Sequence, residues 1–173
     1  KMMDRHVFLI GMPGSGKSSL GKRLAGRLGV PYVDTDTMIT EMTGMTIQQI
    51  FDGPGEQAFR NAETNVLMYL ADQRPAIIST GGGMVMKEVN RLIMRNQGII
   101  ILIDRPLEDI LSDIKLDRRP MLAAKGKDEV VRLYNERIDI YRKVADAVLD
   151  NSQGYTNGIM NLEKLVIRFM GDI

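Results

Sequence analysis

Gly11-Met12-Pro13-Gly14-Ser15-Gly16-Lys17-Ser18 is the stretch that decides the fold class, because it has the spacing G-x-x-x-x-G-K-[ST] of a phosphate-binding loop, or P-loop. The run before it, residues 6–10, is apolar and partly β-branched, which is typical of a buried strand. After it, Leu20, Leu24 and Leu28 recur at the spacing of a helix face. A strand, a glycine-rich turn and a helix are the context that this motif requires, so the sequence predicts a phosphate-binding site.

The residue types in this stretch suit a nucleoside triphosphate with its metal ion. Glycines let successive backbone N–H groups face a phosphate without an intervening Cβ atom, and the start of the following helix adds partial positive charge. Lys17 is expected to reach the β- and γ-phosphates, and the Ser18 hydroxyl to ligate Mg²⁺. The residues expected to bind ATP are Gly14, Ser15, Gly16, Lys17, Ser18 and Ser19. A glycine-rich turn without a ligand is the alternative.

Composition limits the chemistry and the partners that the chain can have. Its 173 residues are 44% hydrophobic and 26% charged, so we expect a single domain over residues 1–173 with a core of its own. A net charge of +1 gives no basic footprint for nucleic acid. The absence of cysteine excludes disulfides, zinc–thiolate sites and cysteine nucleophiles. No apolar run is long enough to span a membrane, and we expect a cytoplasmic monomer without nucleic-acid or membrane partners.

Apolar, strand-like runs alternate with helix-like segments along the chain. The expected strands are residues 6–10, 32–34, 76–80, 99–103 and 147–150. The expected helices include residues 19–28, 37–43, 46–51, 56–72, 87–95, 128–145 and a last one around 159–169. This alternation predicts a three-layer α/β/α fold around a parallel sheet, whose ligands lie beyond the carboxyl ends of the strands. His6, the only histidine, opens the first strand and is expected to be a strand-edge residue rather than a catalyst.

The second expected strand ends in Asp34-Thr35-Asp36. If the chain stays extended, the i, i+2 spacing points both carboxylates the same way. One carboxylate could then hold the water shell of Mg²⁺, and the other could orient an attacking hydroxyl. The alternative is that Asp36 caps the helix expected from Thr37. Because a P-loop precedes the pair, we favour the functional role.

Two further segments carry candidate ligand-binding groups. Arg60 and Glu63 are spaced to pair on a helix, either as a solvent-exposed ion pair or as an arginine steered toward an anion. Gly81-Gly82-Gly83 follows the third expected strand. Residues without side chains at this point favour close approach of the backbone to a ligand, with a flexible turn as the alternative.

Residues 115–127 are charged, lack a helical period and contain Arg118-Arg119-Pro120. We expect a mobile lid that closes over the nucleotide, with a solvent-exposed basic loop as the alternative. Arg137 lies further on, in a charge-rich helix. Sequence spacing alone gives it no precedence over Arg132 or Arg142.

Taken in order, these motifs resemble those of shikimate kinases over essentially the whole chain. The matching segments are residues 11–18, 34–36, 55–63, 81–83, 119–122 and 136–142. The resemblance implies the fold of nucleoside-monophosphate kinases, with a five-stranded parallel sheet in the order 2-3-1-4-5 and a mobile lid. It also implies transfer of the ATP γ-phosphate to the 3-hydroxyl of shikimate, in the chorismate route to aromatic amino acids, with Mg²⁺ as cofactor.

The resemblance also implies which residues bind shikimate, within a region of about residues 36–63. Asp36 would bind the hydroxyls and act as base, while Arg60 and Arg137 would hold the carboxylate and Glu63 would fix Arg60. The backbone triplet and two apolar walls complete the implied set: Gly81, Gly82, Gly83, Phe51 and Phe59.

At the nucleotide side, the resemblance implies that Asp34 acts on Mg²⁺ together with Ser18, and that Arg119 is the lid arginine. The implied catalytic residues are Lys17, Asp36 and Arg119. The chain departs from the family pattern at the adenine end. Ser112 stands seven residues before Arg119, where many members have an arginine, and residues 151–156 lack the Asn-Pro of many members.

Two alternatives to this function remain open from the sequence. One is another small-molecule P-loop kinase, such as a gluconate kinase, which has no need for the combined acidic, basic and triple-glycine set. The other is a non-catalytic binding or regulatory relative. The chain has a matching residue at each catalytic position that the resemblance implies, and this disfavours the non-catalytic alternative.

Overall fold

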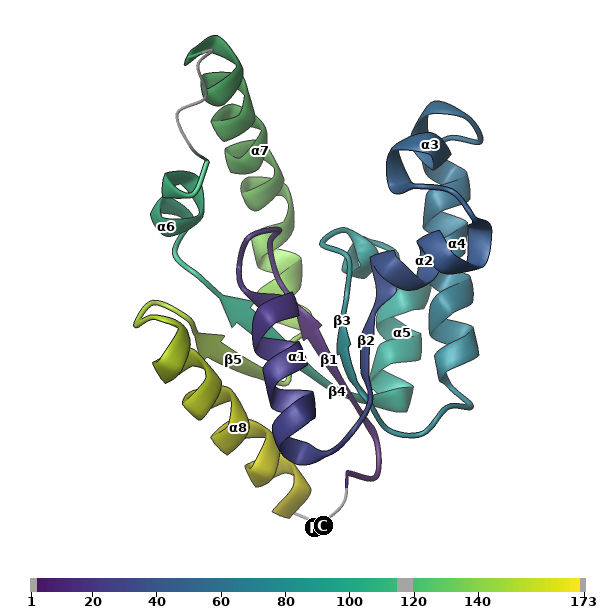
Figure 1. Cartoon of the computed structure of the whole chain (residues 1–173), viewed down its shortest axis with the longest axis vertical. Coiled ribbons are helices and arrows are strands. Elements are labelled where there is room, and N and C mark those ends of the chain that lie inside the picture. The colour runs from purple at the N-terminus through teal and green to yellow at the C-terminus, as the bar shows by residue number, and fades with distance from the viewer. Residues whose placement is uncertain (1–2, 115–119, 172–173) are drawn as a thin grey trace.

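A computed structural model of the chain describes residues 3–114 and 120–171 (Figure 1). Its centre is one sheet of parallel strands: β1 (His6–Ile10), β2 (Tyr32–Asp34), β3 (Ile77–Ser79), β4 (Gly98–Asp104) and β5 (Ala147–Asp150). The strand order β2-β3-β1-β4-β5 confirms the predicted order 2-3-1-4-5. The phosphate-binding loop therefore follows the central strand.

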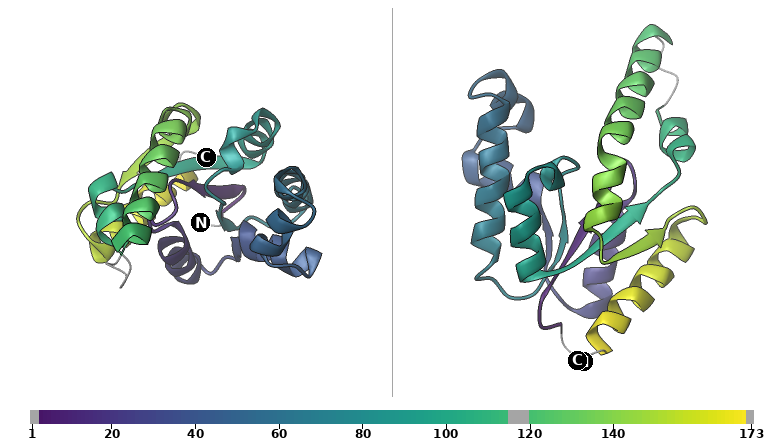
Figure 2. Two further views of the ribbon diagram at one scale, coloured as in Figure 1. Left: turned by 90° about the horizontal axis from the view of Figure 1, so that it is seen from above. Right: turned by 180° about the vertical axis from the view of Figure 1, so that it is seen from behind.

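Helices connect the strands and cover both faces of the sheet, so the predicted three-layer fold is confirmed (Figure 2). They are α1 (Lys17–Leu28), α2 (Thr35–Thr43), α3 (Ile47–Asp52), α4 (Glu56–Leu70), η1 (Met84–Met86), α5 (Glu88–Gln97), α6 (Leu107–Ser112), α7 (Pro120–Val144) and α8 (Tyr155–Gly171). Seen from above, α1 lies on one side of the sheet and α5 and α7 on the other (Figure 2).

The core has two halves, because alternate residues of a strand face opposite sides of the sheet. From β1, Phe8 and Ile10 pack in a cluster with residues of α4, α5 and α7. Val7 and Leu9 pack in the other cluster, with residues of α1 and α8. The sheet is thus covered on both faces, and α7 and the α2–α4 segment extend on either side of its carboxyl edge (Figure 1).

Helix α7 begins at Pro120, so the expectation of an irregular segment as far as residue 127 is wrong for its second half. Proline favours the first turn of a helix, and the residues after it include good helix formers. The scattered charges concealed this start from a search for apolar period. Residues 115–119, which include Arg118 and Arg119, lie outside the described part of the chain.

His6 is the first residue of the central strand, as expected, and its side chain is buried. Its Nδ1 accepts the backbone N–H of Ala76 (3.1 Å), and its Nε2 donates to the carbonyl of Leu70 (2.7 Å). The ring is thereby held in one neutral tautomer, which gives His6 a structural role. Within the described residues, no helix is long and apolar enough to cross a membrane.

Candidate active site

The loop over residues 11–16 has a backbone that only glycine adopts without strain at several positions. Gly11, Gly14 and Gly16 have φ angles of 147°, 84° and 101°. At Gly11 a Cβ atom would also lie 2.7 Å from the carbonyl oxygen of Ile103. The glycines therefore shape the loop that leads into the N-terminus of α1, where backbone N–H groups are free for a phosphate.

Lys17 and Ser18 follow this loop at the first turn of α1. The Lys17 side chain is buried, and its Nζ donates to the carbonyl oxygens of Gly11 (2.6 Å) and Met12 (2.9 Å). Burial lowers the pKa of Lys17 to about 8, although Asp36 opposes this change. The Ser18 hydroxyl donates to Asp34 Oδ2 at 3.2 Å.

The oxygen atoms of Ser18 and Asp34 fit a Mg²⁺ ion that arrives with a nucleotide. Mg²⁺ prefers oxygen ligands, and it commonly uses one or two protein groups together with phosphates and water. The described residues contain no group of three His, Cys, Asp or Glu side chains that could hold a metal by themselves.

The two aspartates after β2 are placed differently from the expectation. The chain does not stay extended, because α2 begins at Thr35. Asp34 is the residue that caps this helix, accepting the N–H of Thr37 on Oδ1 (3.1 Å), so the capping role does not belong to Asp36. Asp36 lies in the first turn of α2, and both carboxylates line the same cavity.

The glycine triplet after β3 is the point where the charged side chains meet. A Cβ atom on Gly81 would lie 2.7 Å from Asp36 Oδ1 and 3.1 Å from Glu63 Oε2. On Gly82 it would lie 2.8 Å from Arg137 Nη1, and on Gly83 it would lie 2.6 Å from Arg60 Nη1. Each glycine thus leaves room for a charged group from α2, α4 or α7. The groups that lie close to the triplet in the structure are these side chains, and the expected approach of its backbone to a ligand stays a prediction.

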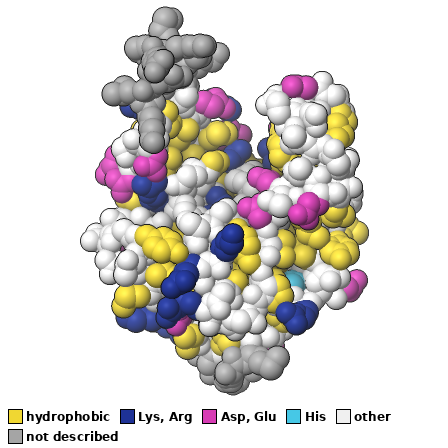
Figure 3. All heavy atoms as spheres, viewed as in Figure 1, with side chains coloured by type: hydrophobic (Ala, Val, Ile, Leu, Met, Phe, Trp, Pro, Cys, Tyr) yellow, Lys and Arg dark blue, Asp and Glu magenta, His cyan; other side chains and the backbone are white. Residues whose placement is uncertain are grey.

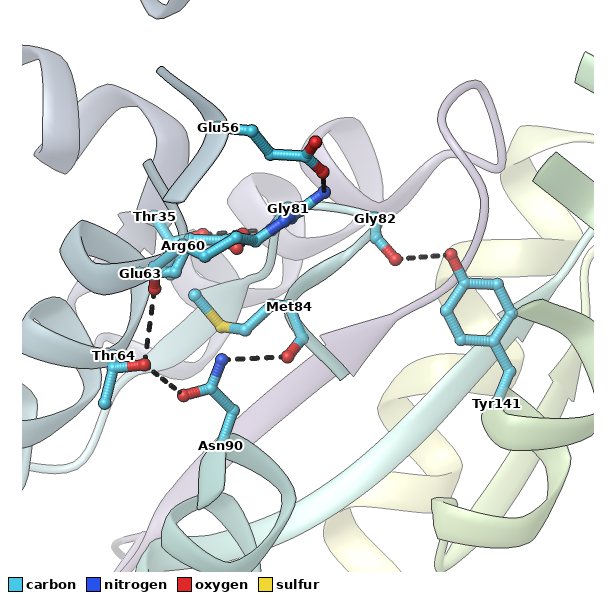
Figure 4. A network of polar contacts seen from close by, with 10 residues as sticks. All are labelled: Thr35, Glu56, Arg60, Glu63, Thr64, Gly81, Gly82, Met84, Asn90 and Tyr141. Atoms are coloured by element: carbon cyan, nitrogen blue, oxygen red, sulfur yellow. Dashed lines mark hydrogen bonds and ion pairs between the residues drawn. The ribbon is translucent and has the colours of Figure 1, made fainter. Parts of the chain in front are cut away.

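Arg60 and Glu63 form a largely buried ion pair, not a solvent-exposed one. Their charged atoms are 2.8 Å apart, and the Glu63 side chain is 1% exposed (Figure 4). Burial raises the pKa of Glu63, while the hydrogen bond from Arg60 opposes this effect. The Arg60 guanidinium also lies over the ring of Phe59, at 5.3 Å from its centre, and Phe59 in turn contacts Phe51.

Three buried polar atoms beside the triplet have no hydrogen-bond partner among the described residues: Asp36 Oδ1, Glu63 Oε2 and Arg137 Nε. Buried charged groups without partners are costly, so they indicate a polar ligand that would satisfy them. Burial, and then the charge of Asp34, raise the pKa of Asp36. Its carboxylate is therefore more basic than an exposed one.

A single cavity of about 760 Å³ joins this region to the phosphate-binding loop. It opens in the hollow between α7 and the α2–α4 segment, where acidic and basic side chains gather (Figure 3). The predicted residues that line it are Gly14, Ser15, Gly16, Lys17, Ser18, Ser19, Asp34, Asp36, Gly81 and Gly82. Gly83, the third glycine, is not part of the lining. Arg60 and Arg137 lie against Gly83 and Gly82, beside the cavity.

The far end of the cavity contains residues that the sequence analysis missed. Arg105 donates to the carbonyl of Gly14 (2.9 Å) and pairs with Asp113. Tyr155 at the start of α8 is half-exposed and lines the same space. Ser112 instead donates to the carbonyl of Asp109 (2.7 Å). No motif marked Arg105 or Tyr155, because their places depend on how α6 and α8 pack against the loop.

Supporting residues around the triplet were also missed. Thr35 Oγ1 accepts the N–H of Gly81 (3.0 Å), and Tyr141 donates to the carbonyl of Gly82 (2.6 Å) (Figure 4). Both residues stand inside motifs that we quoted, but their spacing gave no reason to assign them a role.

The fold and the site define the class of protein. A P-loop after the central strand of a 2-3-1-4-5 parallel sheet, with an acidic and basic pocket in the same cavity, is the architecture of a P-loop kinase that acts on a small molecule.

Comparison with known proteins gives the family. The family described as shikimate kinase matches residues 13–165, and the chain belongs to this family. The chain is 39% identical to a shikimate kinase of Clostridium botulinum (strain Eklund 17B / Type B) over 165 residues, which cover 95% of this chain and 99% of that protein.

Solved structures agree with this assignment. Shikimate kinase from Acinetobacter baumannii, solved in complex with shikimate, has a TM-score of 0.83 and 30% identity, covering 97% of this chain and 93% of that chain. Shikimate kinase from Aquifex aeolicus has a TM-score of 0.80 and 32% identity, and the match covers 96% of this chain and 97% of that chain. A gluconokinase from Sinorhizobium meliloti has 12% identity and a TM-score of 0.56, and the match covers 99% of this chain and 97% of that chain. This likeness shows a shared fold alone.

Proposed function

We propose that this chain transfers the γ-phosphoryl group of ATP to the 3-hydroxyl of shikimate. The observation that carries the proposal is the glycine triplet, where Asp36, Arg60 and Arg137 meet beside a cavity that the phosphate-binding loop also lines. Shikimate is a small ring acid with several hydroxyls, so it needs cationic groups at one end and hydrogen-bonding groups at the other. The relatives named shikimate kinase support this choice of substrate.

The carboxylate of shikimate would be held by Arg60 and Arg137. The two guanidinium groups come from different helices, α4 and α7, and lie against neighbouring glycines. A planar guanidinium can donate two parallel hydrogen bonds to a carboxylate. Within the part of the chain that the structure describes, Arg137 Nε is a buried atom without a hydrogen-bond partner, which supports a ligand at this place.

Asp36 would orient the attacking hydroxyl and accept its proton. The bond that forms joins the hydroxyl oxygen to the γ-phosphorus, and the bond that breaks joins the γ-phosphorus to the bridging oxygen of the departing ADP. A carboxylate whose pKa is raised by burial is a better base than an exposed one at neutral pH.

Lys17, Ser18 and Asp34 would act on the nucleotide. The Lys17 ammonium would contact the β- and γ-phosphates from its place in the loop, and Ser18 and Asp34 would hold Mg²⁺. When bound, that ion neutralises charge on the phosphates. We propose Arg119 as the remaining cation at the nucleotide, and the family resemblance supports this choice. Arg119 lies outside the described residues.

We also infer a monomer that acts in the cytoplasm, without nucleic-acid or membrane partners. The net charge of +1 supports the absence of a nucleic-acid partner.

The experiment is an ADP-release assay with Mg²⁺ and ATP, in the presence and absence of shikimate. We expect release that depends on shikimate, and little release with gluconate. Release with gluconate alone would indicate the rival kinase activity. Tight binding of shikimate without turnover would indicate the non-catalytic alternative.

A further inference from the structure

The two arginines at the glycine triplet are held in place by different means. Arg60 is fixed by Glu63 at 2.8 Å and by Glu56 at 3.7 Å (Figure 4). Among the described residues, no carboxylate forms an ion pair with Arg137, and its Nε has no hydrogen-bond partner. The direction of the Arg137 side chain must therefore come from the way in which α7 is seated on the triplet.

The residue that connects α7 to the triplet is Tyr141. Its side chain is 1% exposed, and its hydroxyl donates to the carbonyl of Gly82 at 2.6 Å (Figure 4). Tyr141 follows Arg137 by one helical turn, so the two side chains lie on the same face of α7. Both converge on Gly82, since a Cβ atom on this glycine would lie 2.8 Å from Arg137 Nη1.

The chemistry of the hydroxyl suits a permanent donor. Burial raises the pKa of Tyr141, and the Arg137 guanidinium opposes this change. The phenol therefore keeps its proton at neutral pH and can donate it to a carbonyl group, which has no proton of its own. Packing alone does not need this hydroxyl, because the ring of a phenylalanine fills nearly the same volume.

We propose that the Tyr141 hydroxyl is a positioning group for the acceptor site: by donating to the Gly82 carbonyl, it fixes α7 against the glycine triplet and directs Arg137 toward the substrate carboxylate. This inference rests on the proposed function, because the carboxylate is that of shikimate. Tyr141 does not touch the substrate itself. Its effect passes through Arg137.

The first test is Tyr141→Phe, which keeps the ring and removes the hydroxyl. We expect the Kd of shikimate, measured by calorimetry, to rise about tenfold, the effect of one well-placed hydrogen bond. The Kd of ADP should change less than twofold. The matched control is Tyr134→Phe, since Tyr134 is a partly buried tyrosine of the same helix that packs against the same core cluster. We expect it to change neither constant.

A double-mutant cycle separates positioning from a general structural role. In an Arg137→Ala background, Tyr141→Phe should weaken shikimate binding less than twofold further, because the group on which the hydroxyl acts is gone. A tenfold loss in both backgrounds would overturn the proposal and make Tyr141 a structural residue. Wild-type protein that binds ADP but not shikimate would overturn the proposed function and this inference together. Normal binding by Tyr141→Phe would overturn the inference alone.

A second variant covers the case in which Tyr141→Phe does not fold. Gly82→Ala keeps the hydroxyl but places a Cβ atom 2.8 Å from Arg137 Nη1 and 3.1 Å from Pro13 Cδ. We expect at least a tenfold rise in the Kd of shikimate, since the guanidinium must move. An unchanged Kd would show that Gly82 does not set the place of Arg137, and would overturn the proposal.

Discussion

The two glycine-rich turns at the cavity use glycine for opposite reasons. In the phosphate-binding loop, Gly11, Gly14 and Gly16 have positive φ angles, so glycine serves the backbone conformation. The triplet over residues 81–83 has no positive φ angle, so glycine serves space. The first turn leads into the N-terminus of α1, where backbone N–H groups can face a phosphate. The second lets charged side chains from separate helices lie against the chain.

This difference teaches where each half of the site is encoded. The phosphate-binding half is contained in one contiguous stretch, and its lysine already has backbone carbonyls as partners. The acceptor half exists only when α2, α4 and α7 meet at the triplet, and it retains buried polar atoms that have no hydrogen-bond partner in the described ranges, residues 3–114 and 120–171. Changes in the first half should therefore affect the chemical step, and changes in the second should affect binding of the acceptor.

The largest effect is expected from Lys17→Ala. Loss of the ammonium leaves the charge that develops on the transferring group without its nearest protein cation, and we expect kcat to fall by more than about 10³-fold. Steady-state assays measure this change. The Kd of shikimate should stay within threefold. Lys22→Ala, on the exposed side of α1, is the matched control and should behave as wild type. Near-normal turnover by the Lys17 variant would contradict the assignment of the loop.

Asp36→Asn should lower kcat by about 10²-fold or more, because the amide keeps the shape but cannot accept the proton. Asp36 belongs to the acceptor half by position, yet it acts on the chemical step, so this variant sharpens the comparison. Glu41→Gln, an exposed acid on the same helix, is the control. A fall of less than threefold in kcat/KM would remove Asp36 from the mechanism.

Arg60→Ala and Arg137→Ala should each raise the KM of shikimate by about 30- to 100-fold, with a smaller effect on kcat. The carboxamide of shikimate tests the cause, since the variants should lose little with this neutral analogue. Arg142→Ala, on the exposed side of α7, is the control. Equal losses on the acid and on the amide would contradict a role in binding the carboxylate.

The two arginines should differ in stability. Arg60→Ala leaves the buried Glu63 without its ion-pair partner and should lower the free energy of unfolding by about 2 kcal/mol. Arg137→Ala removes no ion pair among the described residues and should cost much less. Denaturant unfolding of both variants measures the difference. Equal losses in the free energy of unfolding would contradict the conclusion that an ion pair holds Arg60 in place and that Arg137 is held by other means.

The pH dependence of kcat/KM should be bell-shaped, with a change of about tenfold per pH unit on each side. Activity rises as Asp36 loses its proton, at a pKa above the usual aspartate range, and falls as Lys17 loses its proton, at about 8. In the pH profile of kcat, the fall on the alkaline side should occur at a higher pH than in the profile of kcat/KM, since bound phosphates favour the charged lysine. Asp36→Asn should abolish the acidic limb of the profile. An unchanged acidic limb would assign this titration to another group.

The smallest effect is expected at the far end of the cavity, from Tyr155→Ala. If the base of the nucleotide stacks on this exposed ring, removal of the ring should weaken nucleotide binding about fivefold. The Kd of ADP should rise, while that of inorganic tripolyphosphate should not change. Tyr69→Ala is the control, because Tyr69 is equally exposed on α4 and does not line the cavity. Equal losses for both ligands would place Tyr155 at the phosphates.

Several parts of the structure could be predicted because they depend on neighbours in the chain. The phosphate-binding loop and the strands β1, β2 and β5 have the expected bounds, since a glycine pattern and short apolar runs are local signals. Local signals also mislead where two of them compete. Asp34, not Asp36, caps α2, because the helix begins two residues earlier than expected. Helix α7 begins at Pro120, where charges conceal the apolar period.

The acceptor half of the site depended on tertiary structure. Without the family resemblance, Arg137 and Arg132 were equivalent members of one charged helix. In the fold, Arg132 is 59% exposed and pairs with Glu136 at 3.0 Å, whereas Arg137 lies against Gly82. The reason is physical. Spacing along a helix determines which side chains share a face, but only the packing of α7 against β4 and the glycine triplet determines which face meets the ligand.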